Sequence, residues 1–193
     1  MNTLAMALAW AAVLGQCGRN PAEVDRFASE LIELSTRHNF GYWLAFGAIL
    51  RGWARSASGD TVEGIQWIEN GIRDSRATGS LVTLPYYLGL KAEALYLADR
   101  PSDALETIQE AEKVVERSEE RQWCAELHRL RGVFLTAMGA DDAQIAASFC
   151  EAIRIAKEQK SVSLGTRAET TYAEYRRHQA SGSKERSFRL PLW

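Results

Sequence analysis

The clearest pattern in the sequence lies in residues 41–80, which read GYWLAFGAILRGWARSASGDTVEGIQWIENGIRDSRATGS. The first half is rich in small and apolar residues and ends at Ser58-Gly59-Asp60, where a helix stop precedes a residue that can cap the next helix. Four apolar residues then recur at intervals of three and four: Val62, Ile65, Ile68 and Ile72. This spacing predicts one buried stripe on a second helix, antiparallel to the first.

The same arrangement returns about every forty residues. A column of small residues has these members, with 40 residues between the first four and 41 before the last: Ala12, Gly52, Ala92, Gly132 and Ala173. Where two helices cross, a missing side chain lets the backbones approach closely. This role explains the mid-helix glycines, each of which costs about 1 kcal/mol relative to alanine. A repeat of this length is typical of stacked helical hairpins.

We therefore predict an all-α protein, a right-handed α-solenoid of stacked antiparallel helix hairpins with about nine helices. The expected helices are 3–17, 21–38, 42–57, 61–77, 84–98, 102–118, 121–138, 142–159 and 163–178. The expected units are 3–40, 41–80, 81–120 and 121–160, followed by the final helix at 163–178. In this interpretation residues 1–180 form one repeat domain and residues 181–193 form a C-terminal tail.

Composition and charge exclude several classes of protein. The chain has 193 residues, and its 23 basic and 25 acidic residues leave a formal net charge of −2. No overall basic field attracts nucleic acid or anionic lipid, so we expect neither as a partner. Three cysteines without a CxxC pair favour a reducing compartment over a disulfide scaffold, and we expect a cytoplasmic protein. The eleven apolar residues at 4–14 are too few to span a bilayer, and no basic residue precedes them as in a secretion signal.

Motifs that carry chemistry are missing from the sequence. It contains no phosphate-binding GxxxxGK[ST] loop, no GxGxxG after a strand and no G-x-S-x-G. Cys124 and His128 lie four residues apart on one predicted helix face, where both could bind one zinc ion. Zinc requires three or four ligands, and the other histidines and cysteines offer no matching pair. We therefore expect no enzyme, no cofactor and no metal site.

The columns of small and large residues resemble those of the tetratricopeptide repeat. Gly64/Ile68/Gly71 and Ala104/Ile108/Ala111 stand in the small–large–small positions of that family, although the unit here has 40 residues instead of about 34. Leu50-Arg51-Gly52-Trp53 and residues 125–132, AELHRLRG, more closely resemble the long repeats of large bacterial signalling proteins. In those proteins the repeats follow a cyclase domain and an ATPase module, or accompany a transcription-regulator domain. The resemblance reaches to about residue 178 and implies a regulatory or scaffold segment.

In stacks of this type the first helix of each hairpin lines the concave side, where we expect a groove that holds a protein or peptide. The predicted groove residues are Phe46, Trp53, Tyr86, Glu93, Glu126, Arg129 and Arg167. Two alternatives compete with this interpretation: Phe46 and Trp53 are core residues, and Glu126 pairs with Arg129 one turn along the same helix. The alternative function is a sensing domain that binds a small molecule in the groove, which a deep, closed, apolar pocket would favour.

Both ends of the chain carry apolar segments. The helix expected at 4–14 has no polar residue on any side, whereas a terminal repeat normally shows a polar outer face. We expect a homodimer, or an upstream domain of a longer protein, to cover it. At the other end an apolar tip follows the break at Ser181-Gly182-Ser183: Phe188, Leu190, Leu192 and Trp193. This tip either folds back over the last helix or serves as a tethered peptide for a neighbouring groove.

Overall fold

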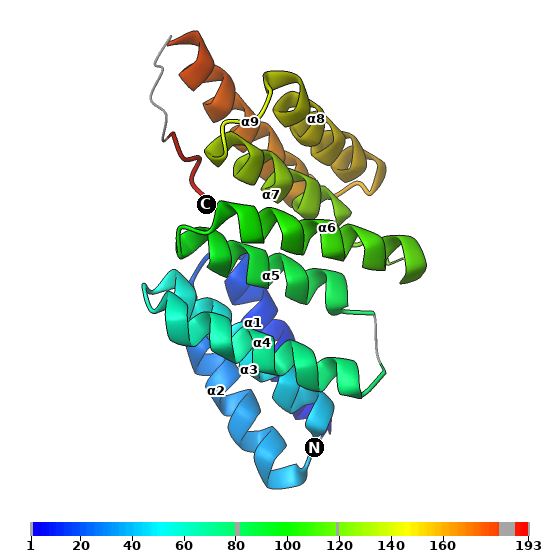
Figure 1. Cartoon of the computed structure of the whole chain (residues 1–193). Helices are drawn as coiled ribbons and strands as arrows, with labels where there is room; N and C mark the ends of the chain where they lie inside the picture. The colour runs from blue at the N-terminus through cyan, green and yellow to red at the C-terminus, as the bar shows by residue number, and fades with distance from the viewer. Residues whose placement is uncertain (1, 80–81, 119, 182–187, 193) are drawn as a thin grey trace. The chain divides into compact units, whose positions relative to one another are not determined.

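The computed structural model describes residues 2–79, 82–118, 120–181 and 188–192, and these ranges contain nine α-helices and no strand. The helices are α1 (Asn2–Cys17), α2 (Pro21–His38), α3 (Gly41–Ala57), α4 (Thr61–Ala77), α5 (Leu84–Leu97), α6 (Pro101–Ser118), α7 (Cys124–Ala137), α8 (Asp142–Glu158) and α9 (Val162–Ala180) (Figure 1). The predicted all-α helical-repeat fold is confirmed. The largest difference at a helix start is in α7, which begins at Cys124 instead of residue 121.

The chain forms two compact units, Met1–Asp99 with α1 to α5 and Arg100–Trp193 with α6 to α9. Within each unit every helix packs against the next one in the chain. Odd-numbered helices also pack against the next odd-numbered helix, α1 against α3, α3 against α5, and α7 against α9. This second set of contacts is the mark of stacked hairpins, because it joins the same helix of successive repeats. The division into one repeat domain and a tail stays a prediction.

Local signals in the sequence set the helix starts. The side chain of Asn20 accepts a hydrogen bond from the backbone N–H of Glu23 at 3.2 Å, and Asp60 accepts one from Glu63 at the same distance. Each bond satisfies a backbone donor that the first turn of a helix leaves without an intrahelical partner. No helix in the described ranges combines the length and the apolarity that a membrane span requires.

The small-residue column does bring helix backbones together. A methyl group at Gly52 of α3 would lie 2.6 Å from the carbonyl oxygen of Gly64 and 2.7 Å from Cγ1 of Ile68, both on α4. In the second unit, a methyl at Gly132 of α7 would lie 2.7 Å from the ring of Phe149 on α8. These distances are too short for any Cβ, so the α3–α4 and α7–α8 hairpins each depend on a glycine at the crossing point.

Basic residues stand one position before three members of the small-residue column. Each forms an ion pair with the helix that precedes its own. They are 40 residues apart and each faces an acidic side chain: Arg51 with Asp25 at 3.4 Å, Lys91 with Glu69 at 2.8 Å, and Arg131 with Glu112 at 2.8 Å. These positions were not singled out from the sequence, although their period was visible there. All three pairs are partly exposed, so their main contribution is to orientation and each stabilises the fold by no more than about 1 kcal/mol.

We expect the substitution Gly52→Ala to lower the free energy of unfolding by about 2 kcal/mol, because the new methyl forces α3 and α4 apart. Gly41→Ala is the matched control, since it lies at the start of the same helix and a methyl there meets no atom within 4 Å. Urea unfolding followed by circular dichroism measures both variants. Equal stability of Gly52→Ala and wild type would show that the crossing does not require glycine.

Candidate functional site

The predicted groove residues lie largely inside the two units. Six of the seven side chains belong to residues that are at most 7% exposed, and the seventh, Arg167, is half-buried. Phe46 and Trp53 are core residues, as the alternative interpretation proposed. Residues so deeply buried present almost no surface to a partner, and their role in binding stays a prediction. The polar members of the set are gathered in two clusters, one in each unit.

The cluster of the first unit is built around the carboxylate of Glu93 on α5. Its Oε2 atom accepts hydrogen bonds from Nη1 of Arg19 at 2.5 Å and from Nε1 of Trp53 at 2.8 Å. Arg19 lies in the turn between α1 and α2, with the left-handed φ of 57°. One buried carboxylate thus joins that turn, α3 and α5. Charge-assisted hydrogen bonds of this kind are strong where water is excluded.

Tyr86 extends the cluster toward α1. Its hydroxyl donates to Oε1 of Gln16 at 3.3 Å, and burial raises the pKa of Tyr86 well above its ordinary value, with Cys17 and Glu93 adding to the effect. The phenol therefore stays protonated and acts as a hydrogen-bond donor. Such an environment suits a structural polar contact and does not suit a catalytic base.

The cluster of the second unit is built around Arg129 on α7, whose side chain is completely buried. Its Nε and Nη2 atoms donate to the two carboxylate oxygens of Glu126 at 3.0 and 2.8 Å, which confirms the alternative pairing within one helix. From α9, Arg167 donates to the same carboxylate at 3.1 Å and Thr171 accepts from Arg129 at 3.4 Å. The cluster therefore fastens α7 to α9.

Both clusters follow one geometric rule. Trp53 and Glu93 are 40 residues apart, and Glu126 and Arg167 are 41 apart, so each pair occupies one column of the repeat. Column neighbours touch because successive odd-numbered helices pack side by side. All four residues were identified from the sequence but were assigned to a surface. The sequence did contain a signal for these buried contacts: residues of opposite charge, or a hydrogen-bond donor and an acceptor, stand in one column of the repeat.

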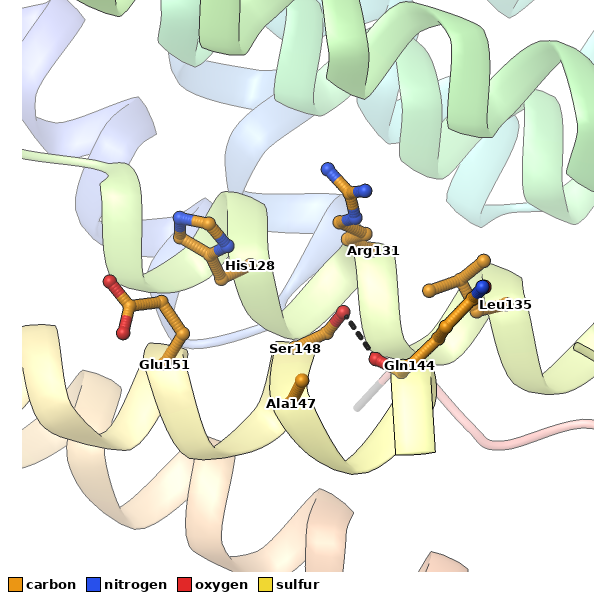
Figure 2. A pocket seen from close by; sticks show the side chains of 7 residues that line it. All are labelled: His128, Arg131, Leu135, Gln144, Ala147, Ser148 and Glu151. Atoms are coloured by element: carbon orange, nitrogen blue, oxygen red, sulfur yellow. Dashed lines mark hydrogen bonds between the residues drawn. The ribbon is translucent and has the colours of Figure 1, made fainter. Parts of the chain in front are cut away.

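A surface cavity of about 440 Å³ lies between α7 and α8 in the second unit. Its lining residues are His128, Arg131, Leu135, Gln144, Ala147, Ser148 and Glu151 (Figure 2). Figure 2 shows His128 and Glu151 at the same end of the cavity and the Arg131 guanidinium pointing away from α8. A second cavity of about 260 Å³ shares His128 and Arg131 and reaches Glu112, Glu116 and Cys124. Both linings combine charged and polar groups with apolar side chains such as Leu135 and Leu127.

Burial shifts the pKa values of two groups in these cavities, His128 and Cys124, toward their uncharged forms. Burial lowers the pKa of His128, an effect that Glu112 and Glu151 oppose and Arg131 and Arg154 reinforce. Burial raises the pKa of the Cys124 thiol, which disfavours the nucleophilic thiolate. Within the part of the chain that the structure describes, no group of three or more His, Cys, Asp and Glu side chains could hold a metal ion.

The face of α1 that points to solvent is unusually apolar. The helix buries Ala5, Ala9, Ala12 and Val13 and half-buries Leu8, while four of its larger apolar side chains are exposed. The exposed fractions are 52% for Leu4, 45% for Met6, 53% for Trp10 and 71% for Leu14. A helix that packs alone against a domain does the reverse, because burial of the largest apolar side chains releases the most free energy. We call these four residues the α1 stripe.

Comparison with known proteins supports the fold. No protein-family model matches the chain. A protein of Rhizobium meliloti (strain 1021), the uncharacterized protein R02095, is 28% identical over 147 residues, which are 76% of this chain and 14% of that protein. The chain thus corresponds to a small part of that relative. The crystal structure of Bacillus thuringiensis PlcR in complex with the peptide PapR7 and DNA superposes with a TM-score of 0.64 at 14% identity, over 81% of this chain and 70% of that one. This likeness concerns the helical-repeat fold.

We expect Arg129→Ala to lower the free energy of unfolding by about 3 kcal/mol, because it leaves the buried Glu126 carboxylate with fewer donors. Arg154→Ala is the control: Arg154 also contacts two carboxylates, those of Glu151 and Glu158, but on the exposed face of α8. We expect it to leave stability nearly unchanged. Chemical denaturation of both variants measures the two changes in the free energy of unfolding. Equal changes would show that the buried cluster stabilises the protein no more than the exposed ion pairs of Arg154.

We expect the second unit to become less stable as the pH decreases, because His128 is buried. In the unfolded chain a histidine binds a proton at a pH of about 6.5, while burial lowers the pKa of His128 in the folded state. Below that pH the unfolded state binds the proton more strongly, so stability present above it is lost as the pH decreases. We expect a smaller drop in melting temperature on acidification for His128→Gln than for wild type. Identical drops would exclude His128 as the source.

Proposed function

We propose that this chain is a non-catalytic helical-repeat module that binds other protein chains, and that a second copy of itself is one of its partners. The α1 stripe is the single observation that carries the proposal. Monomeric proteins seldom expose a contiguous set of large apolar side chains, and such a surface typically marks a protein interface. Tryptophan in particular is enriched among the residues that dominate binding energy.

The chemistry of α1 favours a second copy over other occupants. A symmetric dimer brings the same surface patch of both subunits together, so a patch with a net charge faces a patch of the same charge. From Asn2 to Cys17 the helix has no charged side chain, and this repulsion does not arise. Met6, Trp10 and Leu14 follow one another at intervals of four residues and form a ridge about 12 Å long. Two such ridges can pack beside each other in a dimer.

The cavities support a protein partner better than a small-molecule ligand. A sensing domain is expected to offer a closed, mainly apolar pocket with few polar groups. The cavities around His128 instead contain Arg131, Glu112, Glu116 and Glu151, and exposed residues such as Gln144 and Ala147 form part of their walls. Open, charged surfaces of this kind are typical of the rim of a protein interface.

We further propose a regulatory role in bacterial cytoplasmic signalling. Three observations support it: the resemblance of the repeats to those of cyclase and ATPase signalling proteins, the likeness in fold to PlcR, and a relative that is much longer than this chain. In its crystal structure PlcR is in complex with both a peptide and DNA. For this chain we propose protein or peptide partners, since a net charge of −2 provides no general attraction for nucleic acid.

Surface substitutions test this proposal better than substitutions at Trp53 or Arg129, whose burial makes them affect stability first. We expect wild type to form a dimer in sedimentation velocity, with a dimer fraction that rises with concentration. Trp10→Glu combined with Leu14→Glu should give a monomer, because each two-fold contact would then bury like charges. The matched control is Val62→Glu on α4, which should remain dimeric. The prediction that placed Val62 in the buried stripe of this helix is wrong: it lies in the first turn and is 82% exposed, whereas Ile65, Ile68 and Ile72 are buried.

Two results would contradict the dimer. One is a wild-type protein that is monomeric at every concentration, which would assign the α1 stripe to a different protein segment. The other is a double variant that associates as strongly as wild type, which would place the interface elsewhere on the molecule.

A further inference from the structure

The described part of the C-terminal tail, residues 188–192, buries alternate side chains. Leu190 is 1% exposed and Leu192 4% exposed, while Arg189 and Pro191 are exposed and Phe188 is half-buried. These residues belong to no helix or strand. Burial of every second side chain is the pattern of an extended segment that lies with one side on a surface. Gly182, Ser183 and Trp193, which also belong to the predicted tail, lie outside the described residues.

One contact of this segment is known in detail. The ring of Phe188 stacks on the ring of His178 in the last turn of α9, with 3.5 Å between the centroids and 5° between the planes. The tail therefore folds back on α9, which was one of the two arrangements expected from the sequence. The aromatic residue at its start is held by a ring on the helix, and the two leucines beyond it are covered.

The sequence of residues 188–192 favours an extended backbone. Proline has a fixed backbone φ and no N–H group, and it restricts the residue before it to extended conformations. Pro191 thus keeps Leu190 extended without leaving a backbone donor to satisfy at its own position. An extended peptide with little conformational entropy to lose is the type of ligand that grooves of interaction modules recognise.

We infer that residues 188–192 occupy a peptide-binding site of this chain, whose ligands are extended peptides with an aromatic residue followed by aliphatic residues at the second and fourth positions after it. The tail is then a built-in competitor that any partner peptide must displace. This inference rests on the proposed protein-binding role and names both the class of partner and its regulation. It involves the C-terminal tail and α9 and does not depend on the α1 stripe.

Competition by a tethered segment has a predictable size. A segment joined to its site by a short linker acts at an effective concentration of about 1 mM, so a free peptide with a Kd of about 0.1 mM binds roughly tenfold more weakly while the tail is in place. Releasing the tail should restore the intrinsic affinity. The leucines offer a direct way to do so, because an aspartate at either position cannot be buried without a large desolvation cost.

The experiment measures fluorescence anisotropy of a labelled peptide with the sequence of residues 188–192, FRLPL, added to the full chain. We expect the variant Leu190→Asp/Leu192→Asp to bind this peptide at least about tenfold more tightly than wild type. Arg189→Lys keeps the charge of an exposed side chain of the same segment and should behave as wild type. A labelled peptide with both leucines replaced by aspartate should bind neither protein.

The inference is wrong if the labelled peptide binds wild type and the double variant equally, or binds neither. Circular dichroism checks that the double variant keeps its helices; should it lose them, Phe188→Ala replaces it, because this change removes the stack on His178 without adding charge. Peptide binding by Phe188→Ala no tighter than by wild type would then overturn the inference. A chain that dimerises through α1 but shows no release of the site keeps the proposed function and loses this inference. A chain that stays monomeric but binds the peptide more tightly once the tail is released keeps this inference and loses the proposed dimer.

Discussion

The close approach of two helices at the glycines of the small-residue column is the constraint on which the rest of the structure depends. At Gly52 and Gly64 the helices α3 and α4 are so near that neither position has room for a methyl group. Such contact determines how each hairpin is built, and similar hairpins stack in similar ways. The stacking in turn places odd-numbered helices side by side within each unit. The positions of buried polar groups and exposed apolar groups follow from this arrangement.

Buried polar clusters are the first consequence. Residues in one column of the repeat become neighbours, so a charged residue placed there is removed from water and needs a partner in the same region. Glu93 finds Trp53 one repeat earlier and Arg19 in the first turn of the chain, and Glu126 finds Arg167 one repeat later. These contacts stabilise the stack where a binding groove was predicted. The binding role of these residues stays a prediction, and the surfaces proposed above for binding lie elsewhere on the molecule.

The two ends of the chain offer such surfaces, each for a different reason. On α1 the side chains buried against α2 and α3 are mostly small, and Leu4, Met6, Trp10 and Leu14 are left in solvent. In the tail, Leu190 and Leu192 are buried although their segment, residues 188–192, belongs to no helix or strand. The first surface lacks a partner in the described chain, and the second already holds one. The proposed association of whole chains and the proposed recognition of short peptides therefore involve separate surfaces of this molecule.

The sequence by itself determined the fold class, the forty-residue period and most helix boundaries, because caps, turns and apolar spacing act within a few residues of one another. Its prediction for 61–77 matches α4 at both ends, whereas α7 begins three residues later than predicted. It also identified the unusual apolar character of α1, since composition alone reveals it. Only the tertiary structure decided which side of each helix is covered. Trp53, Glu93 and Arg129 have the composition of a binding surface but are buried, because the contacts that cover them join residues about forty positions apart, and helical periodicity does not specify those contacts.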